Sequence, residues 1–298
     1  FEAAYEGKVK AMYILGENPV LTDSNANHIK KALENLDFLV VQELFLTETA
    51  EFADVVLPSS SFAETDGTFT NTERRPQRVR QAIEPLPGKF GWQIICEMSS
   101  RMGYPMSYNH PSEIWAEMAS LSPSMAGISY ERMEKESVHW PCPTPEHPGT
   151  PILHIGKFTR GLGGFQPNEH IPPGEMPDEE YPILLCTGRI MQHYNVTTQY
   201  SAGINSVWDK EMTEVHPQEA KKLGLVTGSR MRVTSRRGSI VTNVWVTDKV
   251  QPGVIWMAHH HSETPTNEVT SHHVCDIAGT YEYKVCAVKI EKVQEVNE

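Results

Sequence analysis

The sequence predicts an α/β domain built on a parallel sheet, followed by a domain built as a β-barrel. Two observations indicate this order. Near the amino terminus, apolar strand-like runs flank a helical pattern, whereas beyond a proline-rich stretch short strands follow one another with one helix among them. The composition, 39% hydrophobic and 21% charged residues, is typical of a globular protein with a core of ordinary size.

The first strand-helix-strand unit covers residues 9–41. Residues 9–15 form an apolar run, a helix is expected to begin near Asp23 or Ser24, which are good N-caps, and residues 38–41 form a second buried strand. A crossover of this kind joins parallel strands, so the loop at residues 16–22 is expected at the carboxyl end of the first strand. Open α/β sheets bind ligands at that end.

The rest of the predicted first domain extends to residue 140. A third apolar run at residues 55–57 ends in Pro58 and three serines, and Asp66-Gly67 is expected to form a tight hairpin turn. Helices are expected at residues 92–102 and 111–121, where they would cover the sheet.

A linker is predicted at residues 141–180, because ten of the 21 prolines lie between Pro141 and Pro182. The barrel domain would then cover residues 181–298. Its expected helix, at residues 217–223, begins with a proline and is followed by Gly224. Its expected strands are residues 183–186, 230–235, 239–247, 254–257 and 283–290.

Charge and cysteine usage restrict the classes of partner. The net charge of −12 disfavours nucleic acid and anionic membranes, and no apolar stretch approaches the roughly 18 residues of a membrane span. Neither nucleic acid nor direct membrane insertion is expected. The five scattered cysteines form no C-x-x-C pair and are interpreted as buried, reduced thiols, which favours a cytoplasmic location. Because the chain starts at Phe1, we expect a fragment or a processed subunit.

A series of short motifs in a fixed order resembles the molybdopterin oxidoreductase family. Together the motifs span nearly the entire chain, and so many in one order make a chance match improbable. They are Gly16-Glu17-Asn18-Pro19, Val41-Gln42-Glu43, Thr47-Glu48-Thr49-Ala50, Ala53-Asp54-Val55-Val56-Leu57-Pro58, Glu64-Thr65-Asp66-Gly67-Thr68-Phe69-Thr70-Asn71-Thr72-Glu73-Arg74-Arg75, Thr187-Gly188-Arg189, His193-Tyr194, Glu214-Val215-His216-Pro217, Leu223-Gly224, Ser235-Arg236-Arg237-Gly238, Asn267-Glu268-Val269-Thr270 and Tyr283-Lys284-Val285-Cys286-Ala287-Val288.

The resemblance implies a Rossmann-like α/β domain and a double-psi-type, six-stranded barrel, both of which bind molybdopterin dinucleotide. The run from Trp92 through Met106, with Glu113-Ile114-Trp115 after it, most resembles formate dehydrogenases. The implied function is that of the C-terminal, cofactor-binding portion of a catalytic (alpha) subunit that oxidises formate to carbon dioxide. Two alternatives remain open: another enzyme of the family, such as a nitrate or arsenate reductase or a respiratory-complex subunit, or a non-catalytic cofactor-binding fragment.

The implied cofactor is a pair of molybdopterin guanine dinucleotides holding molybdenum or tungsten. By the family pattern, one arm is held in the α/β domain by Gly16, Asn18, Thr22, Gln42 and Ser59. Asn18, and Gly91 further along, stand where some relatives carry Asp. The barrel is expected to contribute Thr187, Gly188, Arg189, His193, Tyr194, Asn195, Asn267, Thr270, Tyr283 and Lys284. Outside that context, Arg189 could be a surface ion-pair residue and Tyr283 a packing residue.

No catalytic residue and no metal ligand is expected in this sequence. The resemblance places the metal-ligating selenocysteine or cysteine, and the cysteines of a 4Fe-4S cluster, in an N-terminal region that the sequence lacks. The expected partners are therefore formate, that missing region or chain, and iron-sulfur subunits that carry the electrons away.

Three local patterns receive ordinary interpretations. The triplet His259-His260-His261 is not expected to bind a metal, because consecutive residues of an extended chain point to alternate sides. Arg74-Arg75 is expected to fix a loop or a subunit contact. Glu64 and Asp66 are attributed to turn formation and not to paired-carboxylate catalysis.

Overall fold

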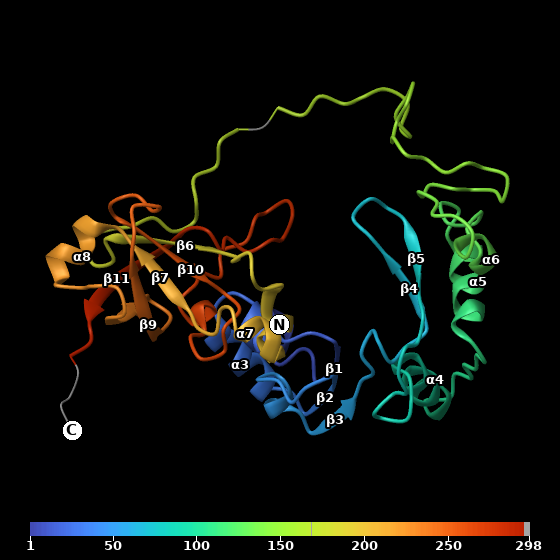
Figure 1. Ribbon diagram of the computed structural model, residues 1–298, viewed down its shortest axis with the longest axis horizontal. Coiled ribbons are helices and arrows are strands. Elements are labelled where there is room, and N and C mark those ends of the chain that lie inside the picture. The colour runs from blue at the N-terminus through green and yellow to red at the C-terminus, as the bar shows by residue number, and fades with distance from the viewer. Residues whose placement is uncertain (168, 295–298) are drawn as a thin grey trace. The chain divides into compact units, whose positions relative to one another are not determined.

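A computed structural model describes residues 1–167 and 169–294 of the chain (Figure 1). The residues group into two compact units, one made of residues 1–57 and 170–298 and the other of residues 58–169. This grouping cuts across the predicted domain boundaries, because the N-terminal sheet belongs with the barrel and not with the helices that follow it. Each unit is described separately.

The first unit contains a three-stranded sheet in the order β1-β2-β3, and its strands include the three apolar runs predicted as strands. Strands β1 and β2 run parallel, with Ala11 opposite Phe38 and Leu15 opposite Gln42. Ile29 and Leu33 of the intervening helix pack on the apolar side chains of both strands. The elements are α1 (Glu2–Tyr5), β1 (Ala11–Leu15), α2 (Pro19–Thr22), α3 (Ala26–Glu34), β2 (Phe38–Glu43), the 3₁₀ helix η1 (Ala50–Phe52) and β3 (Val55–Pro58).

The crossover helix starts later than the sequence predicted. Its N-cap is Asn25, in the left-handed conformation with φ 54°, and not Asp23 or Ser24. The Ser24 hydroxyl is 2.7 Å from the Thr270 hydroxyl and also contacts the carbonyl of Ser271. The Ser24 hydroxyl, which the local sequence predicted as a helix cap, therefore makes a tertiary contact with the barrel instead.

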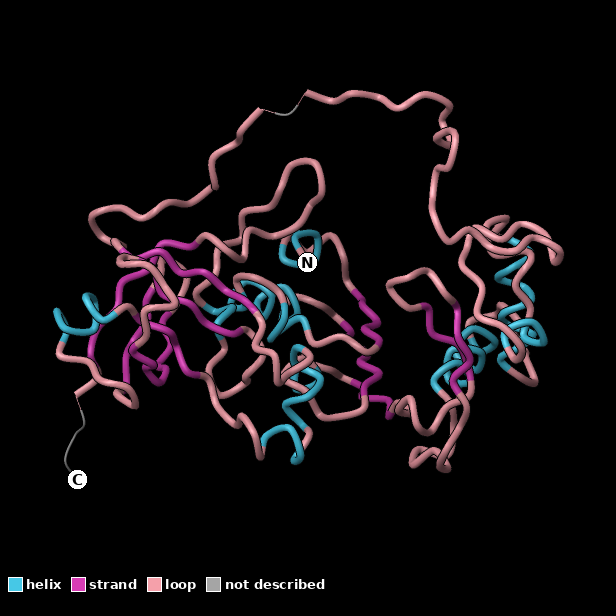
Figure 2. Tube along the Cα trace, turned by 45° about the horizontal axis from the view of Figure 1, so that its top comes forward, coloured by secondary structure: helices cyan, strands magenta, loops and turns pink. Residues whose placement is uncertain are grey.

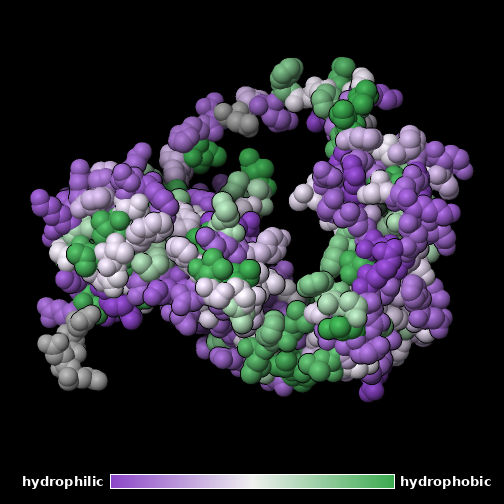
Figure 3. Space-filling view, viewed as in Figure 1, coloured by the Kyte–Doolittle hydropathy of each residue, from purple (hydrophilic) through white to green (hydrophobic). Residues whose placement is uncertain are grey.

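Apolar side chains are exposed at this sheet. Leu44, Phe45 and Leu46 follow β2, and Val55 and Val56 lie in β3; all five are exposed. The space-filling view shows hydrophobic surface gathered near β3 (Figure 3). The apolar residues of the first unit are thus not confined to its interior.

The remainder of the first unit contains a closed barrel of six strands in the order β10-β6-β11-β8-β9-β7. Two neighbouring pairs, β10 with β6 and β7 with β9, are parallel, and the other four are antiparallel. The predicted fold class is therefore confirmed. The elements are β6 (Ile183–Gly188), η2 (Asn195–Tyr200), α7 (Ala202–Asn205), β7 (Met212–Val215), α8 (Pro217–Leu223), β8 (Arg230–Thr234), β9 (Ser239–Val246), β10 (Val254–Ala258), η3 (Thr266–Glu268) and β11 (Cys286–Lys292).

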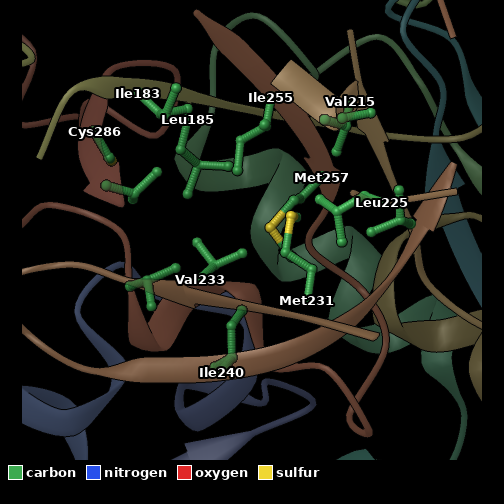
Figure 4. Close-up of a cluster of buried hydrophobic side chains, with 14 residues drawn as sticks. Ile183, Leu185, Val215, Leu225, Met231, Val233, Ile240, Ile255, Met257 and Cys286 are labelled. Atoms are coloured by element: carbon green, nitrogen blue, oxygen red, sulfur yellow. The ribbon is translucent and has the colours of Figure 1, made fainter. Parts of the chain in front are cut away.

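The barrel interior is filled by aliphatic and sulfur-containing side chains. Met231 of β8 and Met257 of β10 meet at its centre, with Leu185, Val233 and Ile255 around them (Figure 4). All five are fully buried. The barrel is thus a packed core and not a channel, and a ligand has to bind at its ends or against its loops.

Hydrogen bonds join the sheet region to the barrel. Lys30 on α3 donates to Glu268 at 2.6 Å, and the amide of Asn27 donates to the carbonyl of Arg237 at 3.1 Å. Together with the contact of Ser24 and Thr270, these bonds explain why residues 1–57 and 170–298 form one compact unit.

The second unit contains a β-hairpin and three helices: β4 (Gly67–Thr70), β5 (Pro76–Val79), α4 (Gly91–Arg101), α5 (Pro111–Leu121) and α6 (Tyr130–Met133). Its core includes Trp115, Ile128 and Tyr130. The indole of Trp115 donates to the carbonyl of Ile128 at 2.6 Å, which satisfies its buried N–H.

The hairpin turn was predicted at the wrong place. Asp66-Gly67 precedes and begins β4, and the chain reverses instead after Thr70, where Arg74 has a φ of 66°. The Asp66 carboxylate accepts from Arg78 at 2.9 Å and 3.1 Å, which ties the start of one strand to the other. Arg74 and Arg75 fix a loop, as expected: Arg74 donates to the carbonyls of Trp140 and Pro151.

Residues 141–167 and 169–182 contain no helix or strand, in agreement with the proline content (Figure 2). All five cysteines are free; Cys96, Cys142 and Cys286 are buried, but Cys275 is exposed, contrary to the expectation for the whole set. Among the described residues, no helix combines the length and apolar character that crossing a membrane requires.

Candidate functional site

A cavity of about 540 Å³ lies at the carboxyl end of β6, a volume within the roughly 300–1,000 Å³ of small-molecule sites. It is lined by Thr22, Thr187, Gly188, Arg189, Asn195, His259, Tyr283 and Lys284. Seven of these eight residues were predicted as site residues from the sequence. The eighth, His259, was considered only within a histidine triplet.

Main-chain carbonyls position the barrel side of the cavity. The Thr187 hydroxyl donates to the carbonyl of Tyr283 at 2.8 Å, and Lys284 donates to the carbonyl of Thr187 at 2.6 Å. These reciprocal bonds hold the segment before β11 against the end of β6. A Cβ at Gly188 would lie 2.6 Å from the indole nitrogen of Trp256, so a larger residue here would force the indole to shift.

The loop after β1 reaches the same cavity through its last residues. The Tyr283 hydroxyl donates to the carbonyl of Thr22 at 3.2 Å. The Asn267 amide donates to the carbonyls of Leu21 and Thr22 at 2.8 Å and 3.1 Å. The sheet loop and the barrel therefore share one cavity, which is the arrangement that a ligand held by both parts requires.

The cavity suits an anionic ligand that can also form hydrogen bonds. Its lining includes Arg189 and Lys284 but no carboxylate. Burial, with added repulsion from these two cations, lowers the pKa of His259. The side-chain oxygen of Asn195 and Nδ1 of His259 are buried and have no hydrogen-bond partner among the described residues. Such orphaned atoms are the groups that a bound ligand would satisfy.

Burial also acts on Tyr283. Desolvation, reinforced by the negative charge of Asp23, raises the pKa of Tyr283 to about 12. Its hydroxyl therefore stays protonated and serves as a donor at neutral pH.

Several predicted residues organise the loops and do not line the cavity. The side-chain oxygen of Asn18 accepts from the backbone and hydroxyl of Thr49, and its amide donates to Glu48 at 2.7 Å. Gly16 takes a φ of 64°, which allows the turn after β1. Gln42, fully buried at the end of β2, accepts from the Tyr13 hydroxyl, and its amide nitrogen has no partner among the described residues.

The other predicted residues also lie outside the cavity lining. Thr270 is fully buried and contacts Ser24 and Asn267, and Tyr194 is 75% exposed. His193 is buried and packs against His260 and His261 instead of lining the cavity. Ser59 follows β3 as predicted but belongs to the second unit.

Two family models match the chain. Residues 1–101 match the family model described as molybdopterin oxidoreductase, and residues 183–287 match that of the molydopterin dinucleotide binding domain. The second match contains seven of the eight cavity residues, all except Thr22, which lies in the first match.

Several curated relatives are formate dehydrogenases. The chain is 46% identical to the F420-dependent formate dehydrogenase 2 subunit alpha of Methanococcus maripaludis, over 96% of this chain and 43% of that protein. It is 37% identical to formate dehydrogenase H of Escherichia coli, over 98% of the chain and 42% of the relative. It is also 35% identical to the assimilatory nitrate reductase catalytic subunit of Bacillus subtilis, over 97% of this chain and 43% of that protein. The chain thus spans less than half the length of these relatives.

Among solved structures, acetylene hydratase from Pelobacter acetylenicus shares the fold. The TM-score is 0.76 at 20% sequence identity, and the match covers 98% of this chain and 46% of that one. The arrangement of sheet and barrel is therefore found in a protein whose sequence has diverged widely.

Proposed function

Because the chain belongs to the molybdopterin oxidoreductase family, we propose that it is the cofactor-holding portion of a formate dehydrogenase catalytic subunit. The observation that carries this proposal is the cavity shared by Thr22 and the barrel loops, with two cations and no carboxylate in its lining. The implied guest is one arm of a bis-molybdopterin guanine dinucleotide.

The chain's own residues would bind and orient this arm. Arg189 and Lys284 would offset the charge of phosphate or pterin oxygens, since charge-assisted hydrogen bonds are among the stronger ones in proteins. The unsatisfied side-chain oxygen of Asn195 can accept from an amino group of the guest, and Nδ1 of His259 can accept or donate according to its tautomer. Gln42, at the end of β2, does not line this cavity, but its buried amide nitrogen also lacks a partner among the described residues. Recognition of the arm would thus depend on these few polar groups.

The reaction proposed for the complete protein is the oxidation of formate to carbon dioxide, one proton and two electrons. When bound, the cofactor supplies the molybdenum or tungsten centre that accepts those electrons. Iron-sulfur clusters and a partner subunit would carry the electrons onward. We propose that the protein ligand to the metal, and the 4Fe-4S cluster, belong to another part of the protein.

This division of labour has a direct test. The 298-residue chain alone is expected to show no formate-dependent reduction of a viologen dye, and the full-length protein is expected to show it. A control with the isolated chain is circular dichroism, which verifies that the barrel has folded. Steady turnover of formate by the folded chain would disprove the division.

A second candidate is nitrate reduction, which the 35% identity to an assimilatory nitrate reductase favours. The same cavity would serve, because both relatives share the dinucleotide-binding region. Parallel assays of the full-length protein with formate and an oxidised viologen, and with nitrate and a reduced viologen, distinguish the two. Turnover of nitrate without turnover of formate would replace the first proposal with the second.

A further inference from the structure

Three buried imidazoles from distant parts of the sequence gather in the first unit. His193, His260 and His261 are each at most 5% exposed, and one potential ligand atom from each lies within 4.8 Å of the others. Their ring centroids are 4.1–5.3 Å apart. Histidine clusters this compact and this buried are unusual in a core, because each ring brings polar nitrogens that need partners.

Three of the six ring nitrogens are buried and have no hydrogen-bond partner among the described residues. Neither ring nitrogen of His260 has a hydrogen-bond partner within residues 1–167 and 169–294, and the same holds for Nε2 of His261. A neutral imidazole whose ring nitrogens have no other partner has a lone pair available for a metal ion.

His193 is held in an orientation common among metal-binding histidines. Its Nε2 lies 2.7 Å from the carbonyl of Trp208, which can only accept, so Nε2 carries the proton and Nδ1 the lone pair. Nδ1 accepts from the Thr198 hydroxyl at 3.0 Å. A metal at Nδ1 would replace one hydroxyl contact, while the bond to the Trp208 carbonyl kept the ring in place.

The two consecutive histidines converge because the chain is no longer a strand where they lie. Strand β10 ends at Ala258, whose N–H donates to Glu211 at 3.0 Å and whose carbonyl accepts from Thr266 at 2.6 Å. On the other side, the N–H of Ser262 donates to Gln199 at 3.2 Å. His259 lines the cavity, whereas the side chains of His260 and His261 both lie in the cluster with His193. The side-chain alternation expected of an extended chain therefore does not hold between His260 and His261.

We propose that His193, His260 and His261 bind a divalent transition-metal ion such as Zn²⁺, at a site distinct from the cofactor cavity. Imidazole nitrogen suits zinc and its neighbours in the first transition row and does not suit Ca²⁺ or Mg²⁺. Tetrahedral Zn–N bonds of about 2.0–2.1 Å place ligand nitrogens roughly 3.3 Å apart, so small ring rotations close the site.

The test uses the full-length protein, stripped with a chelator and then titrated with Zn²⁺ alone. Wild type is expected to bind one zinc ion that His261→Phe binds at least ten-fold more weakly. The matched control is His154→Phe, which changes an exposed histidine of the second unit and is expected to bind zinc as wild type does. Molybdenum or tungsten content is measured in all three proteins, so that zinc binding is separated from cofactor loading and from the proposed enzymatic activity.

Zinc K-edge X-ray absorption on the wild type gives the ligand set without any substitution. Three imidazoles at about 2.0 Å are expected. Equal zinc affinity of His261→Phe and wild type would overturn the proposal. A spectrum with sulfur ligands, or with a single imidazole, would overturn it even if the variant did not fold.

Discussion

At the scale of single residues, the side chains around the cavity fall into two groups. Thr187, Tyr283 and Lys284 already donate to backbone carbonyls and hold the cavity's shape. Asn195 and His259 carry buried atoms with no partner among the described residues. The first group makes the site rigid before a ligand arrives, and the second group provides contacts that only a ligand completes.

The charge of Lys284 is expected to matter for cofactor retention. Lys284→Met removes a cation from the cavity and a donor to the Thr187 carbonyl. A charge-assisted hydrogen bond is worth about 1.5–3 kcal/mol, so roughly ten-fold to 100-fold weaker retention is expected. Guanine nucleotide released by acid from purified full-length protein measures this. Lys221→Met, on the exposed surface of α8, is the control and should retain the cofactor fully. Equal retention by both variants would contradict the assigned role.

Glu211 is expected to make stability depend on pH. It is 2% exposed, and burial raises its pKa to about 8. The folded protein therefore holds a proton on Glu211 that the unfolded chain loses above about pH 4.5, so stability falls as pH rises from about 4.5 to 8. Glu211→Gln keeps an acceptor for the Ala258 N–H but cannot ionise, so the variant should not lose this stability as the pH rises.

The variant should gain stability relative to wild type, by on the order of a few kcal/mol at pH 8 and much less at pH 5. Thermal unfolding at the two pH values measures the difference. Glu263→Gln, at an exposed position, should show no such pH-dependent gain. A Glu211→Gln gain that is the same at both pH values would show that ionisation of Glu211 is not the cause.

At the scale of elements, most strands and helices could be predicted from periodicity and punctuation. Helix α5 has the predicted bounds, and Gly224 ends α8 in the left-handed conformation. Strand β7 was missed because it is short and half polar. Its Thr213 is fully buried, and its hydroxyl is 2.7 Å from the Thr242 hydroxyl of the neighbouring strand β9. These residues are 29 positions apart in sequence, so no local pattern reveals the contact.

An added methyl group at the end of β6 is expected to destabilise the fold. Gly188→Ala would place a Cβ 2.6–2.9 Å from atoms of the Trp256 indole on β10. Overpacking of this kind typically costs about 1–3 kcal/mol. Gly203→Ala is the matched control, since its Cβ would meet only the Ser201 hydroxyl at 3.9 Å within a short helix. Denaturant unfolding of both variants checks this, and restored stability in the double variant Gly188→Ala, Trp256→Phe would confirm the indole as the obstacle.

At the scale of the whole molecule, the candidate site depends on contacts between segments far apart in sequence. Seven of the eight cavity residues were predicted from the resemblance to the family's motifs. The motifs did not predict that the side chains of Asn18 and Asn267 form hydrogen bonds with other loops. Nor could they predict the histidine cluster, since His193 and His260 meet only once the barrel has closed.

Asn267 is expected to hold the sheet loop on the barrel. Asn267→Ala leaves the buried carbonyl of Leu21 without its donor, at a cost of about 1–3 kcal/mol. Hydrogen exchange measured by mass spectrometry should speed up around residues 19–25 and 267–271. Asn35→Ala, which removes an exposed contact with the Tyr5 carbonyl, is the control. Unchanged exchange around residues 19–25 in Asn267→Ala would show that this loop is held by other contacts.

The division of the first unit between residues 1–57 and 170–298 has a consequence for biosynthesis. The sheet of residues 1–57 is synthesised well before Asn267 and Thr270. In the folded unit these two residues hold the sheet region through contacts with Leu21 and Ser24. Residues 58–169 have their own hydrophobic core and can collapse in the interval. The nascent sheet, with Leu44–Leu46 exposed, must meanwhile wait for its distant partner, so translation pauses or chaperone capture in that window should decide the yield of native protein.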